Sequence, residues 1–76
     1  MTEKQILTKI NDAVSDLEVV TRMLSRGRVE EAKEYGAELW VGVYRAVGFS
    51  NNQEILAAQI SFEKQYAIVR QELVNA

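Results

Sequence analysis

The 76-residue chain contains no cysteine, no histidine and no proline. Without cysteine it can form no disulfide, and without both cysteine and histidine it lacks the usual ligands of a structural zinc ion. A chain of this length lies near the lower size limit for a self-sufficient hydrophobic core. We therefore expect one domain, residues 1–76, whose small core is completed by self-association.

The same absences remove the commonest proton shuttles, nucleophiles and metal ligands of enzymes. A row of carboxylates at Glu30, Glu34 and Glu38 could bind a divalent cation, but it lies opposite the apolar side of its predicted helix, as a solvated acidic face does. The four glycines are dispersed and form no phosphate-binding loop. We expect no enzymatic activity, no metal and no cofactor.

An excess of positive charge is also missing, because nine basic residues face eleven acidic ones and the formal charge is −2. Nucleic acid is therefore not the expected partner. No apolar stretch approaches the roughly 20 residues that cross a bilayer, so no membrane contact is expected. The start of the chain lacks the pattern of a signal peptide, and the absence of cysteine agrees with a cytoplasmic location.

What the chain has is apolar residues at helical spacing, 47% of the sequence. Thr2 and Gln5 form a capping box, which predicts a first helix over about 3–26 that ends before Gly27. Positions three and four residues apart lie on one face of a helix. The predicted core stripe of this helix is Ile6, Ile10, Ala13, Leu17, Val20 and Leu24.

Two further helices are predicted, over about 29–47 and 51–74. Gly48 marks the end of the second helix, with Phe49 expected to pack against it, and the third starts with either Ser50 and Gln53 or Asn51 and Glu54 as a capping box. Their stripes are Val29, Ala32, Gly36, Leu39, Val43 and Ala46, then Ile55, Phe62, Tyr66, Val69 and Leu73. Short joints favour antiparallel neighbours. The prediction is an all-α fold, an up-down-up three-helix bundle or a helical hairpin unit, completed by dimerisation.

The joint between the first two helices resembles the helical hairpins of tetratricopeptide-type and related microtubule-interacting bundles. The shared features are Gly27, the pair Glu31 and Ala32, and the aromatic Tyr35. The motif is not repeated along the chain. The resemblance implies a shared way of packing two antiparallel helices.

The second helix carries more apolar surface than one face can bury. Between Leu39 and Tyr44, apolar or aromatic groups occupy every direction around the helix, because successive residues are rotated by about 100° around its axis. Gly36 and Gly42 each weaken the helix, which suggests close approach of another helix, from a second chain or within the monomer. Because aromatic residues are enriched in interfaces, we predict an interface formed by Tyr35, Trp40, Val41, Tyr44 and Phe49.

These features predict a non-enzymatic protein–protein interaction module, an inhibitor, adaptor or assembly chaperone, that forms a homodimer. One alternative is a small nucleic-acid-binding regulator that uses Arg22, Arg26 and Arg28 at the first joint, since arginine binds phosphate through a bidentate fork. A second alternative is a structural subunit of a helical assembly, in which the same apolar surface binds head to tail. The sequence leaves open whether Trp40 belongs to the core or to an interface.

Overall fold

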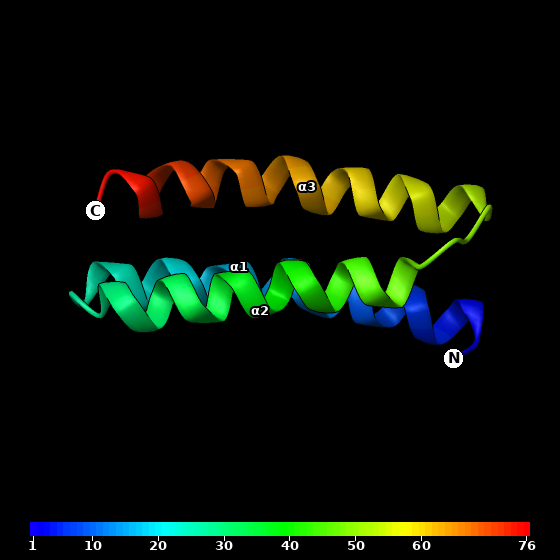
Figure 1. The fold of residues 1–76 in the computed structure, drawn as a ribbon, viewed down its shortest axis with the longest axis horizontal. Coiled ribbons are helices and arrows are strands. Elements are labelled where there is room, and N and C mark those ends of the chain that lie inside the picture. Colours follow the sequence, from blue (N-terminus) through cyan, green and yellow to red (C-terminus); the bar gives the residue numbers. More distant parts are fainter.

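A computed structural model describes residues 1–76 as three packed α-helices without any strand. The helices are α1 (Glu3–Ser25), α2 (Val29–Val47) and α3 (Gln53–Val74). α1 and α3 run in one direction and α2 runs in the other, so that the long axes of all three lie roughly parallel (Figure 1). The predicted all-α, three-helix architecture is confirmed.

The ends of α1 form as the sequence predicts. The backbone amide of Gln5 donates to the Thr2 hydroxyl at 3.1 Å, and the Thr2 amide donates to the Gln5 side-chain oxygen at 2.8 Å. At the other end Gly27 has a φ of 78°, which glycine adopts at little cost. The amide of Arg28 can then donate to the Met23 carbonyl at 2.9 Å, which turns the chain back into α2.

The start of α3 differs from the prediction. Neither Ser50 nor Asn51 caps the helix; the side-chain oxygen of Asn52 accepts hydrogen bonds from the amides of Glu54 at 2.9 Å and Ile55 at 3.1 Å. The Ser50 hydroxyl instead accepts from the Asn52 amide at 3.2 Å. The helix begins later because residues 49–52 are used to cross from α2 to α3.

The predicted packing of Phe49 against the end of α2 is also wrong. Phe49 is fully exposed, at 104% of its reference area. Gly48 has a φ of 53° but a ψ of −125°, far from the ψ of about +47° in the left-handed helical cap. The chain therefore leaves α2 in a direction that turns the Phe49 side chain toward solvent.

All three helices contribute to the core. Most of the predicted stripe positions are buried, and the core consists of Ile10, Ala13, Leu17, Val20, Ala32, Val43, Val47, Ile55, Phe62, Val69 and Leu73. A Cβ atom on Gly36 would lie 3.4 Å from Leu73 Cδ1 and 3.9 Å from Val20 Cγ1, which are van der Waals distances, so position 36 leaves room for little more than a methyl group. α1 packs extensively against both other helices, whereas α2 and α3 contact each other less. The side where α2 meets α3 is therefore the more open one.

None of the three helices combines the length and the apolar character that crossing a membrane requires.

Candidate interaction surface

Trp40 extends from α2 toward α3 and packs on two aromatic rings there. Its ring centroid lies 4.9 Å from that of Tyr66 and 6.2 Å from that of Phe62, and Tyr44 lies one turn along α2 at 5.9 Å. These separations fall in the range of favourable aromatic pairs, each worth on the order of 1 kcal/mol. We call Trp40, Tyr44, Phe62 and Tyr66 the aromatic cluster. Phe62 is fully buried, Trp40 and Tyr66 are half-buried, and Tyr44 is exposed.

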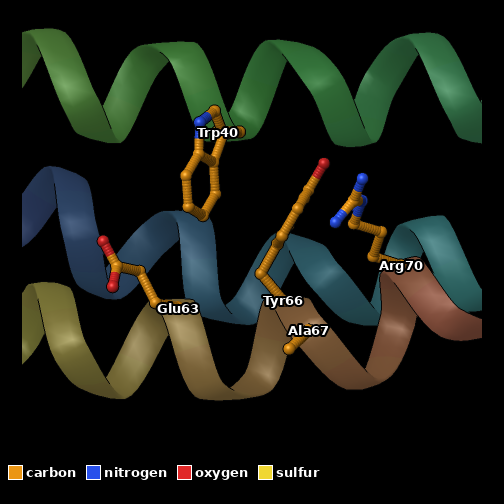
Figure 2. A pocket seen from close by; sticks show the side chains of 5 residues that line it. All are labelled: Trp40, Glu63, Tyr66, Ala67 and Arg70. Atoms are coloured by element: carbon orange, nitrogen blue, oxygen red, sulfur yellow. The ribbon is translucent and has the colours of Figure 1, made fainter.

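Beside the aromatic cluster lies a groove between the two helices. This α2–α3 groove has a volume of about 440 Å³ and is lined by Trp40, Glu63, Tyr66, Ala67 and Arg70. Figure 2 shows Trp40 and Tyr66 reaching into it from opposite helices, with Glu63 and Arg70 on either side. A second hollow of about 340 Å³ is lined by Trp40, Val41, Tyr44 and Arg45. Because Trp40 lines both, the two hollows adjoin.

Several apolar side chains near this groove face solvent. Val41 is 42% exposed and Tyr44 is 59% exposed on α2, while Ile60 is 53% exposed and Val74 is 66% exposed on α3. Ile60 and Val74 lie seven residues before and after Ala67, so the three share one line along the helix. We call Ile60, Ala67 and Val74 the outer line of α3. Since Ala67 lines the groove, the outer line runs along its edge.

Two charges of opposite sign also line the groove. The Gln59 side-chain amide donates to Glu63 Oε1 at 3.3 Å, and this bond helps to orient the carboxylate. The single ion pair of the structure joins Arg28 and Glu31, at the other joint. Glu63 and Arg70 therefore have no ionic partner within the chain.

The structure brings together three of the five residues predicted to form the interface, namely Trp40, Val41 and Tyr44. Tyr35 lies on a different side of α2, in a hollow of about 340 Å³ between α1 and α2. Phe49 lies in the connection between α2 and α3 and projects into solvent. The five residues do not form one continuous patch.

Tyr35 has the one clearly shifted titration in the chain. Partial burial raises the pKa of the Tyr35 hydroxyl above its ordinary value, and the charge of Asp16, hydrogen bonding to Asp16 and the charge of Glu38 add to it in that order. All four causes disfavour the phenolate. The hydroxyl is therefore protonated at neutral pH, and it fits a structural role between α1 and α2.

The three arginines of the alternative hypothesis are exposed at the α1–α2 joint. Arg22 lies in the last turn of α1, Arg26 is its C-cap, and Arg28 precedes α2 and pairs with Glu31. Part of the positive charge at this corner is thus neutralised within the chain. The carboxylates of Glu30, Glu34 and Glu38 do not gather, since no three acidic side chains lie close enough to hold a metal ion.

Sequence reasoning missed the contribution of α3 to this surface. It assigned Phe62 and Tyr66 to the core stripe and did not foresee their contact with Trp40. It did not single out Glu63 and Arg70, and it gave Ile60, Ala67 and Val74 no role beyond flanking the core stripe. The signal was present in the sequence, because Ile60, Ala67 and Val74 recur every seven residues off the core stripe.

Comparisons with known protein families, with curated proteins and with solved structures found no match to this chain.

Proposed function

We propose that this protein is a non-enzymatic interaction module that binds another polypeptide through the α2–α3 groove. The observation that carries the proposal is the half-buried Trp40, which is packed on Phe62 and Tyr66 and still lines two adjoining hollows. Aromatic and arginine side chains are the residues that dominate binding energy at protein interfaces. The groove combines Trp40 and Tyr66 with Arg70.

The packing of the aromatic cluster favours binding for an energetic reason. Ordering a flexible side chain on association costs about 0.5 to 1.5 kcal/mol, but the Trp40 ring is already held by its neighbours on α3. The apolar side chains around it, Val41 and Tyr44 among them, are exposed and would be covered by a partner. A rigid aromatic anchor with an exposed apolar margin suits an inhibitor, an adaptor or an assembly chaperone.

The proposal is tested by placing a photo-crosslinking amino acid at position 41, beside Trp40, in the protein in its native cells. We expect a discrete adduct with a polypeptide from position 41 and none from position 68, because Ile68 is even more exposed than Val41 but lies toward α1. A Tyr44→Ala substitution should reduce the adduct by about tenfold, the effect of removing an interface anchor. Ile68→Ala is the matched control and should leave it unchanged.

Circular dichroism would show that both variants remain helical, since both side chains are exposed in the folded chain. The absence of any adduct at position 41, or an equal yield from position 68, would rule out the groove as the binding surface.

A further inference from the structure

We infer that the occupant of the α2–α3 groove is a second copy of this chain, with two α3 helices paired antiparallel about a two-fold axis at Ala67. The inference rests on the proposed function and names the partner. It is carried by the positions of apolar and charged residues on α3, which are complementary to themselves when the helix is reversed.

The outer line of α3 is symmetric about Ala67. Ile60 and Val74 lie seven residues on either side of it, at about 10 Å along the helix axis. In an antiparallel pair centred on Ala67, Ile60 of each copy meets Val74 of the other, and the two Ala67 residues meet at the axis. The small side chain at the centre allows close approach, and both large exposed side chains become covered.

The charges of the groove are symmetric about nearly the same point. Glu63 and Arg70 are also seven residues apart, and their midpoint falls between Tyr66 and Ala67, within about 1 Å of the apolar centre. Both side chains line the groove and so lie on the same side of the outer line. The two-fold axis is perpendicular to the plane that contains the two α3 helices, so the charged residues of both copies lie on the same side of that plane. Glu63 of each copy then lies near Arg70 of the other.

Such a pairing gives ionic partners to two groups that have none within the chain. An unrelated partner protein could also bind a groove with charged and apolar residues. It would not require the apolar pair and the charged pair of α3 to have the same midpoint along the helix. A two-fold symmetric contact requires this shared centre. If Glu63 of the first copy meets Arg70 of the second, then Arg70 of the first copy must meet Glu63 of the second. The register is also compatible with Lys64 and Gln71, which are seven residues apart. Lys64 of each copy would meet the uncharged Gln71 of the other, so no like charges are brought together.

The dimensions of the molecule are sufficient for a stable dimer. It measures 38 × 18 × 16 Å, so one long face offers on the order of 700 Å², close to the roughly 800 Å² that each partner buries in a standard interface. The chain exposes 5238 Å², whereas a compact monomer of 8.6 kDa is expected to expose about 4,700 Å². The elongated form of a single copy therefore leaves surface available for a second one.

The first test uses the absence of cysteine from the full chain. A disulfide requires two Cα atoms within about 7 Å of each other. The Cα atoms of residue 67 in the two copies come this close only if residue 67 lies at the two-fold axis. Ala67→Cys is expected to form a covalent dimer under mild oxidation at least about tenfold faster than the control Ile68→Cys. Equal rates for the two variants would overturn the inference.

The second test establishes the antiparallel register. Glu63→Arg and Arg70→Glu each place like charges together in a homodimer, so each should weaken self-association by about tenfold or more in analytical ultracentrifugation. An equimolar mixture of the two variants should restore the dimer, because every contact again joins opposite charges. The double variant E63R/R70E should self-associate as the parent chain does.

A mixture that stays monomeric, or single variants that dimerise as the parent chain does, would overturn the register and the inference with it. A parent chain that remains monomeric up to millimolar concentration would do the same. If that monomer still forms an adduct with a different protein from position 41, the homodimer fails while the proposed function stands. If no adduct forms with any polypeptide, both fail.

Discussion

At the scale of single residues, the two glycines of α2 have different surroundings. Gly36 is buried where Leu73 and Val20 approach it from the other helices. A Cβ atom on Gly42 would meet only the end of the flexible Lys9 side chain, at 3.8 Å. The structure gives no packing reason for glycine at position 42, although the sequence suggested the same reason for both.

Gly42→Ala is therefore expected to raise the free energy of unfolding by about 1 kcal/mol, because alanine restricts the unfolded chain and favours the helix. Denaturant unfolding followed by circular dichroism would measure the change. The contrasting variant is Gly36→Leu, whose side chain would overlap Leu73 and Val20 and should destabilise the protein by about 1 to 3 kcal/mol. A loss of stability in Gly42→Ala would show that position 42 is packed more tightly than described.

Tyr35 supplies a prediction about alkaline pH. Because burial and the neighbouring carboxylates of Asp16 and Glu38 raise its pKa in the folded state, the folded protein holds this proton more tightly than the unfolded chain. The associated stability is fully present below about pH 10, the pKa of an unperturbed tyrosine, and is lost as the pH rises through the higher folded pKa.

The free energy of unfolding should therefore fall more steeply as the pH rises above about 10 in the parent chain than in Tyr35→Phe, which has no phenolic proton to lose at that position. Urea titrations at several pH values would measure both slopes. Identical slopes would mean that Tyr35 titrates alike in the folded and unfolded chain.

At the scale of elements, the helix ends show how local chemistry and chain path compete. Thr2 caps α1 as predicted because both partners of its capping box, Thr2 and Gln5, lie within the first turn. Asn52 caps α3 in place of Ser50 or Asn51, since the connection must first cross from α2 to α3. Asn52 is the last residue of this connection, so its side chain is the one that can reach the free amides of Glu54 and Ile55.

Asn52→Ala is expected to lower the free energy of unfolding by about 1 kcal/mol, because the amides of Glu54 and Ile55 lose their acceptor. The neighbouring Asn51→Ala is the matched control and should change stability by less than about 0.5 kcal/mol, as surface substitutions do. Thermal unfolding of both variants beside the parent chain would separate them. A larger loss of stability in Asn51→Ala than in Asn52→Ala would indicate that Asn51 caps α3, as the sequence alone suggested.

At the scale of the whole molecule, the core is small for the length of the helices. Only 12 of 76 residues are buried, and the largest of them is Phe62 at the base of the aromatic cluster. A chain of 76 residues is expected to have a total stability of about 4 to 11 kcal/mol. Any large cavity in this core therefore removes much of the margin that keeps the chain folded.

Phe62→Ala should cost about 3 to 5 kcal/mol, a large part of the stability expected for the chain, and should lower its melting temperature strongly. Thermal unfolding followed by circular dichroism would measure the shift. Ile68→Ala, on the exposed side of the same helix, should keep the parent melting curve. A cooperative, nearly unchanged melt of Phe62→Ala would mean that Trp40 and Tyr66 do not depend on Phe62 for their support.

The sequence by itself determined the three helices, their core stripes and the cap of α1, because helical spacing and local hydrogen bonds depend on residues within one or two turns of each other. Only the tertiary structure decided which side of α2 each excess apolar residue occupies. Trp40 meets Tyr66 and Phe62 across 22 to 26 positions of sequence, and Tyr35 turns away toward α1. Contacts of that range depend on how the helices are placed and rotated against one another, a property that no local pattern in one helix contains.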